Sequence, residues 1–66
     1  MNKHNTVYFV LFGNDRYKPD LHFRACRHKF DHLPDARQYT KPLRSAYIFK
    51  AYFPKGQDFP YITEVR

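Results

Sequence analysis

The sequence is poor in cysteine, glycine and tryptophan, and these shortages exclude several kinds of protein. Its 66 residues contain one cysteine, two glycines and no tryptophan. Because Cys26 has no intrachain partner for a disulfide, we expect a reducing compartment and therefore the cytoplasm. Gly13 and Gly56 are far apart, so the chain has no glycine-rich loop for a nucleotide phosphate.

Long apolar runs are also missing. The longest, VYFVLF at residues 7–12, is far shorter than the roughly 20 residues that span a bilayer, and the opening MNKHNT lacks the basic-then-apolar layout of a signal peptide. We therefore expect no membrane partner. The length of 66 residues predicts one compact domain, residues 1–66, which buries only about 60% of the surface that the unfolded chain exposes.

Acidic residues are outnumbered by basic ones. Twelve lysines and arginines stand against six aspartates and glutamates, which gives a formal net charge of +6. Residues 36–57 hold five of the cations and no acid. This balance predicts a polyanionic partner, which is either a nucleic acid, DNA or RNA, or the acidic surface of another protein.

Residues 5–12 carry the clearest strand signal. They are rich in valine and aromatic residues, and Gly13-Asn14-Asp15 supplies the turn that follows. Both alternating sets are apolar: Val7, Phe9 and Leu11 on one face, and Tyr8, Val10 and Phe12 on the other. This pattern is typical of a central strand covered on both sides.

The apolar residues of the stretch LHFRACRHKF, residues 21–30, fit both the periodicity of a strand and that of a helix. As a strand it points Leu21, Phe23 and Ala25 inward. As a helix capped by Asp20 it forms an apolar stripe of Phe23, Cys26, Phe30 and Leu33. We predict a strand, because the first strand needs a neighbour close in sequence. A helix over residues 20–33 is the alternative.

The next segment, residues 30–46, predicts a short helix. Asp31 is the expected cap, Pro34 suits a first turn, and the inward side is Leu33, Ala36, Tyr39, Thr40 and Leu43. Pro42 cannot continue a helix without losing a backbone hydrogen bond, so we expect the helix to end or kink near Thr40.

Two further strands follow as a hairpin. SAYIFKAYF at residues 45–53 and FPYITEV at residues 59–65 flank the turn PKGQD. The chain therefore predicts an α+β fold with a small, single-layer, mostly antiparallel four-stranded sheet and one short helix on one face. The predicted order is β-β-α-β-β, or β-α-β-β if residues 20–33 are helical.

One helix covers only one side of such a sheet. We expect it on the face of Phe9 and Phe49, which leaves the opposite face, with Tyr8, Lys50 and Tyr52, open. Rings interleaved with cations on an open sheet are typical of single-strand recognition, because the rings stack on bases and the cations neutralise phosphates. The predicted nucleic-acid-binding residues are Tyr8, Arg16, Lys18, Arg24, Lys41, Arg44, Lys50 and Tyr52.

The sequence thus predicts a small, basic, non-enzymatic and regulatory protein that binds single strands or nucleic-acid backbone. A rival from another class is a protein modulator or inhibitor, of the kind that a phage or mobile element encodes, which docks on an acidic surface of a host protein. A homodimer through the same open face is a further alternative.

Histidine and cysteine are the remaining reactive side chains. In a strand, His22 and Cys26 lie about 13 Å apart, too far for one zinc ion with ligand bonds of about 2 Å. A thiol nucleophile needs Cys26 and a histidine in one pocket with an orienting third group. We expect no metal, no cofactor and no catalytic residue; a small ribonuclease of histidine, arginine, lysine and tyrosine is the catalytic alternative.

Overall fold

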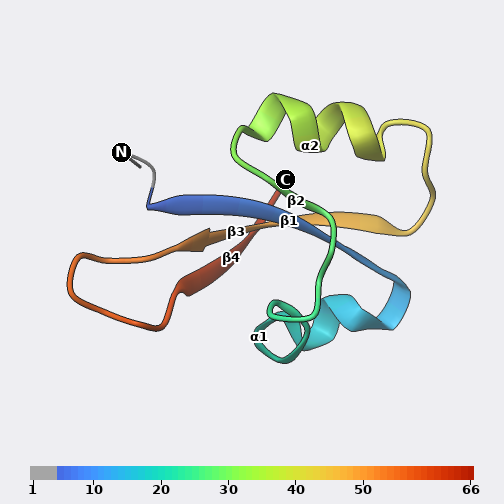
Figure 1. Ribbon diagram of the computed structural model, residues 1–66. Coiled ribbons are helices and arrows are strands. Elements are labelled where there is room, and N and C mark those ends of the chain that lie inside the picture. Colours follow the sequence, from blue (N-terminus) through green and yellow to red (C-terminus); the bar gives the residue numbers. More distant parts are fainter. Residues whose placement is uncertain (1–4) are drawn as a thin grey trace.

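The fold is a four-stranded antiparallel sheet with helical segments on both of its faces (Figure 1). The computed structural model describes residues 5–66, and in that part of the chain the strand order is β2-β1-β3-β4. The elements are β1 (Thr6–Phe12), the 3-10 helix η1 (Gly13–Tyr17), α1 (Pro19–His22), β2 (Lys29–Phe30), α2 (Leu33–Thr40), β3 (Ala46–Tyr52) and β4 (Tyr61–Val65). The predicted α+β class is confirmed.

The central position of β1 follows from its sequence. It pairs with β3 along its whole length, from Thr6 opposite Tyr52 to Phe12 opposite Ala46. Its other edge pairs with the short β2. Phe9 and Val10 are almost fully buried in two different core clusters, one on each face. The prediction of a strand covered on both sides is therefore confirmed.

The second helix, α2, begins at Leu33 and ends at Thr40. Leu33, Ala36 and Tyr39 recur at helical spacing and pack toward the sheet. The helix ends before Pro42, as the lost backbone hydrogen bond predicts. The predicted cap is wrong, because His32 and not Asp31 occupies the N-cap position. Across residues 5–66, no helix has the length and apolarity needed to cross a membrane.

The strand predicted over residues 21–30 is wrong. Only Lys29–Phe30 forms a strand, Pro19–His22 forms one helical turn, and residues 23–28 form a turn and an irregular segment. Leu21, expected inside, is 70% exposed. A full strand here would have extended the sheet, whereas the observed segment folds across it.

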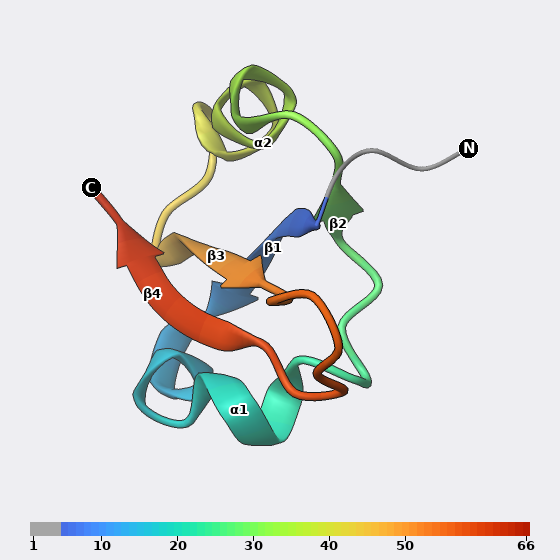
Figure 2. The same cartoon turned by 90° about the vertical axis from the view of Figure 1, so that its left-hand side faces the viewer.

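This segment covers one face of the sheet. The ring of Phe23 lies edge-on to that of Phe9, with 4.9 Å between centroids, and Phe9 stacks on Phe49 at 5.5 Å. Cys26 packs against the same cluster. Figure 2 shows α1 on one side of the sheet and α2 on the other. We call these two sides the α1 face and the α2 face.

The α2 face holds a second buried cluster, formed by Val10, Ala36 and Ile48. The expectation that the helix covers the Phe9 face is therefore wrong. Because both sets of β1 side chains are apolar, alternation shows which residues share a face but not which face the helix takes. The helical alternative for residues 20–33 is also wrong, because its stripe splits: Phe23 packs on the α1 face and Leu33 on the α2 face.

Candidate nucleic-acid interface

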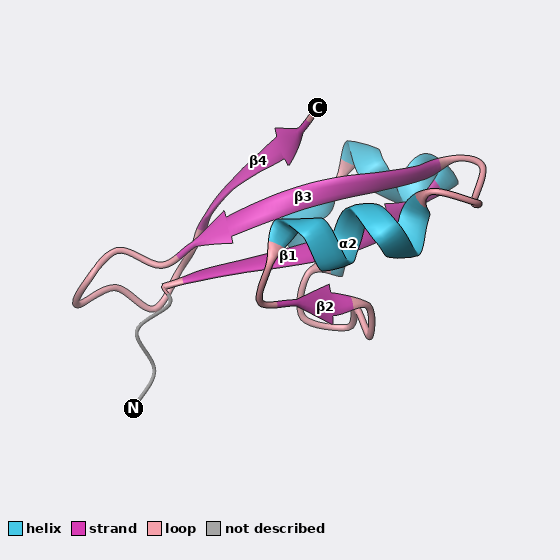
Figure 3. Ribbon diagram, turned by 90° about the horizontal axis from the view of Figure 1, so that it is seen from above, coloured by secondary structure: helices cyan, strands magenta, loops and turns pink. Residues whose placement is uncertain are grey.

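The helix α2 covers only part of its sheet face. It packs with Val10, Ile48 and Val65, in the half of the sheet where β1 and β4 end. Toward the β3–β4 hairpin the same face is uncovered, as the view from above shows (Figure 3). In this open half Tyr52 is 42% exposed and Tyr61 is 61% exposed. Large aromatic side chains are therefore available to a ligand.

Strand register gathers four side chains on the open half. Tyr8 lies directly opposite Lys50 in the β1–β3 pair, and Tyr52 lies directly opposite Tyr61 in the β3–β4 pair. Directly opposed residues of an antiparallel pair share a face, with Cβ atoms about 4.5–5.5 Å apart. We call Tyr8, Lys50, Tyr52 and Tyr61 the tyrosine face.

The tyrosine face combines three rings with one cation. Lys50 is exposed, and its cross-strand neighbours Tyr8 and Thr63 are uncharged. The only carboxylate within β4, that of Glu64, lies on the α1 face and forms an ion pair with Arg16 at 3.8 Å. The nearest acid along the strands therefore does not neutralise the Lys50 ammonium.

Three of the eight predicted site residues, Tyr8, Lys50 and Tyr52, lie together in the tyrosine face. Tyr8 is half-buried because it also packs beside α2, whereas the other two are exposed. The remaining five lie elsewhere: Arg16 in η1, Lys18 just before α1, Arg24 just after α1, Lys41 at the C-cap of α2, and Arg44 in the loop before β3.

Arg16 has a structural environment. Its guanidinium carbon lies 4.0 Å from the centroid of the Tyr47 ring and 5.3 Å from that of Tyr17. A guanidinium over an aromatic face gains electrostatic stabilisation from the ring. Together with the Glu64 ion pair, these contacts hold Arg16 on the α1 face, on the side of the sheet opposite to Lys50.

Tyr61 belongs to the tyrosine face although the sequence did not predict it there. The five-residue turn expected at residues 54–58 pairs even-numbered residues of the two strands with each other, but the observed register pairs even-numbered residues of β3 with odd-numbered residues of β4, such as Lys50 with Thr63. The register depends on where the hairpin loop closes, and an eight-residue loop such as 53–60 gives this pairing. The local sequence does not show that this loop has eight residues and not five, so it could not place Tyr61 next to Tyr52.

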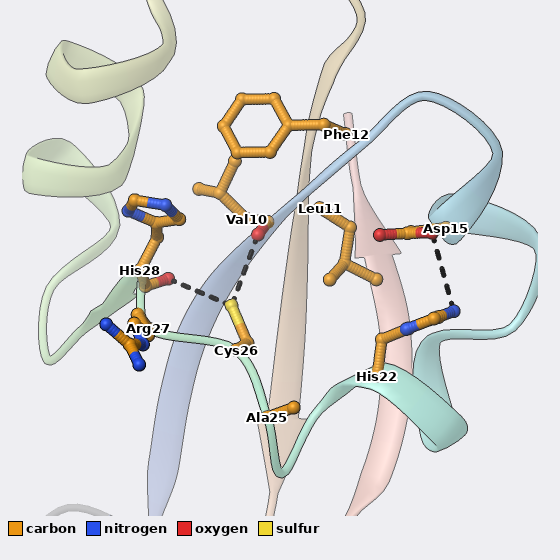
Figure 4. Close-up of a pocket in the computed structure, with 9 residues that line it drawn as sticks. All are labelled: Val10, Leu11, Phe12, Asp15, His22, Ala25, Cys26, Arg27 and His28. Carbon is orange, nitrogen blue, oxygen red and sulfur yellow. Dashed lines mark hydrogen bonds and ion pairs between the residues drawn. The ribbon is translucent and has the colours of Figure 1, made fainter.

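A pocket of about 270 Å³ lies at the other end of β1 (Figure 4). It brings together three residue types of a thiol active site, because Asp15, His22 and Cys26 all line it. Nε2 of His22 lies 3.5 Å from Oδ1 of Asp15. The Cys26 thiol donates instead to the carbonyl oxygen of Val10, at 3.2 Å. Figure 4 shows the thiol and the His22–Asp15 pair on opposite sides of the pocket.

His28, which also lines this pocket, is held by packing. Its ring stacks on that of Tyr39 at 5.1 Å and meets the edge of Phe12 at 5.6 Å. These contacts join the loop before β2 to α2. Within residues 5–66, no three histidine, cysteine, aspartate or glutamate side chains converge as ligands for a metal ion.

Comparisons with protein-family models, with curated proteins and with solved structures find no match for this chain. Function must therefore be inferred from the residues and their geometry.

Proposed function

We propose that this protein is a non-enzymatic, single-strand nucleic-acid-binding protein, and that the tyrosine face is its binding surface. The cross-strand pairing of Tyr52 with Tyr61 beside Lys50 is the main support. It places two exposed rings side by side on a sheet, next to a cation that no strand neighbour neutralises.

The chemistry of the tyrosine face suits unpaired bases. Every base has a flat face that stacks on an aromatic ring, and such stacking is worth about 1–3 kcal/mol per base. Lys50 supplies a positive charge for a phosphate at the same place. In a duplex the bases are already stacked on each other, so the rings have no exposed base faces to meet. The preference for single strands comes from this difference, and applies to both DNA and RNA.

The contacts of Cys26 argue against a thiol nucleophile in the pocket at the end of β1. The Cys26 thiol donates to a backbone carbonyl, and His22 is paired with Asp15. A nucleophile needs a base within hydrogen-bond reach, about 2.6–3.2 Å, and the contacts of Cys26 do not include one. A ribonuclease needs no thiol, so the integrity of labelled RNA during the binding assays tests that alternative separately; the proposal expects the RNA to remain intact.

A protein partner is the second candidate. Leu21 and Phe59 are each 70% exposed, on the α1 turn and on the β3–β4 loop. A pocket of about 230 Å³ lies between these segments, with Phe23, Arg24 and Phe59 in its lining. Aromatic and arginine side chains around a pocket are typical anchors for an interface, and Arg24 suits an acidic segment.

Substitution of the exposed tyrosines tests the proposed function. We expect Tyr52→Ala and Tyr61→Ala each to weaken binding to a labelled oligothymidylate by about 10-fold, since about 1.4 kcal/mol of stacking is lost. Fluorescence anisotropy at low salt measures this. Tyr17→Ala is the matched control, because Tyr17 is 70% exposed but lies in η1 on the other face.

Two results would contradict the proposal. One is the absence of binding to any single strand at low salt. The other is unchanged affinity in the Tyr52 and Tyr61 variants, as in the Tyr17 control, because charge attraction, which these substitutions do not alter, would then explain the binding.

A further inference from the structure

Cations gather where β4 ends beside α2. Nη2 of Arg37 donates to the main-chain oxygen of Arg66 at 3.3 Å, so the Arg37 side chain extends from α2 toward the end of β4. The Tyr39 side chain points toward β2 instead, because its ring centroid lies 5.1 Å from that of His28 and 5.5 Å from that of Phe30. Lys41 follows Arg37 by four residues with helical backbone angles, φ −53° and ψ −44°. It therefore lies on the same flank as Arg37.

The acidic side chains within α2 and β4, those of Asp35 and Glu64, lie away from this flank. Asp35 precedes Arg37 by two residues, which is a rotation of about 200° around the helix axis, and thus shares the β2 side with Tyr39. Glu64 points to the α1 face, where it pairs with Arg16 at 3.8 Å. The positive charge beside β4 is therefore not offset by these two acids.

Strand β4 connects this charge to the tyrosine face. Tyr61 lies at one end of the strand, Thr63 and Val65 follow on the same face, and Arg66 stands just beyond the other end. At about 3.3 Å per residue, Tyr61 and Arg66 are separated by about 17 Å. A stacked single strand with a rise of about 3.4 Å per nucleotide covers that length with about five nucleotides.

We propose that a single strand stacked on the tyrosine face continues along β4, and that its phosphates bind a cation flank formed by Arg37, Lys41 and Arg66. This inference rests on the proposed function and adds a minimum length for the nucleic-acid ligand. A ligand of about five nucleotides or more engages both the rings and the cation flank, whereas a shorter ligand reaches only the rings.

A comparison of two ligand lengths tests the cation flank. The double variant R37Q/R66Q removes two charges from the flank, and R27Q/K29Q removes two exposed charges at the β2 edge, on the far side of the sheet. Because the Lys29 ammonium lies 4.5 Å from the centroid of the Phe23 ring, circular dichroism first checks that both variants are folded. We measure the binding of an oligothymidylate trinucleotide and decanucleotide over a range of salt concentrations. We expect R37Q/R66Q to bind the decanucleotide more weakly. The slope of log affinity plotted against log salt concentration should also be shallower by about two. Trinucleotide binding should be unchanged, and R27Q/K29Q should resemble the wild type with both ligands.

Three outcomes would overturn the cation flank while leaving the tyrosine face intact. They are equal losses in the two double variants, an equal loss with the trinucleotide, and displacement of the decanucleotide by polyglutamate as readily as by unlabelled decanucleotide. The last would identify a general site for acidic polymers, including acidic proteins. If the wild type binds neither oligothymidylate at low salt, the proposed function fails, and the cation flank as a nucleic-acid site fails with it.

Discussion

At the scale of single residues, Phe9 is the centre of the α1 face. Its side chain is fully buried, stacked on Phe49 and met edge-on by Phe23. Edge-on and stacked rings are favourable beyond the apolar area that they bury. Phe23 is the one ring of this trio supplied from outside the sheet, so the stability of the α1 layer depends strongly on it.

Substitution of Phe23 should therefore destabilise the protein. We expect Phe23→Ala to lower the free energy of unfolding by about 2 kcal/mol, below the 3–5 kcal/mol typical of a fully buried phenylalanine because Phe23 is half-buried. Urea denaturation followed by circular dichroism measures this. Leu21→Ala is the control, since Leu21 is 70% exposed, and it should change the free energy by less than about 0.5 kcal/mol. Equal effects of the two substitutions would show that Phe23 does not hold the layer.

At the scale of elements, the sequence predicted those whose periodic pattern was long. The first strand, the helix ending at Thr40 and the β3–β4 hairpin are confirmed, because each has turn residues or a proline at its end. Residues 21–30 were not predictable from periodicity. Their shape depends on the packing of Phe23 against Phe9, a contact across fourteen positions of the chain that no local pattern records.

The sequence predicted only part of the grouping of side chains in the candidate site, for a related reason. Alternation correctly grouped Tyr8, Lys50 and Tyr52, because side chains of one strand alternate strictly and the β1–β3 pairing keeps them on one face. The alternation of side chains could not show that α2 lies on the face of Tyr8, Lys50 and Tyr52 and covers half of that face. The tyrosine face is open because α2, with eight residues, is shorter than the sheet needs for full cover.

The packing of α2 against the sheet can be tested by placing a larger side chain beneath the helix. Ala36 is fully buried under the helix, so we expect Ala36→Leu to destabilise the protein by about 1–3 kcal/mol, because the added atoms have no space. Gln38→Leu adds a similar side chain at an exposed position of the same helix and should change stability by less than about 0.5 kcal/mol. Thermal denaturation distinguishes them. If Ala36→Leu left the stability unchanged, α2 would not be tightly packed against the sheet.

At the scale of the whole molecule, we expect the tyrosine face to be too small to form a stable dimer interface by itself. A stable interface buries about 800 Å² on each partner. That is about 15% of the total accessible surface of 5243 Å², and the tyrosine face has four side chains, of which Tyr8 is half-buried. A twofold axis through this face would also bring Lys50 near the Lys50 of the second copy, and like charges at close range are unfavourable.

We therefore expect a monomer of 8.1 kDa in free solution, and one protein bound to each short oligothymidylate. Sedimentation equilibrium at the concentrations of the binding assay measures both. The homodimer alternative makes the opposite prediction, because a dimer formed through Tyr52 and Tyr61 would have to dissociate before a base could stack. In that case added oligothymidylate would lower the average mass of the protein, and Tyr61→Ala would produce monomers without any nucleic acid. Monomers produced by Tyr61→Ala alone would assign the tyrosine face to self-association, whereas a lower mass on adding oligothymidylate would show that nucleic acid and a second copy compete for the same rings.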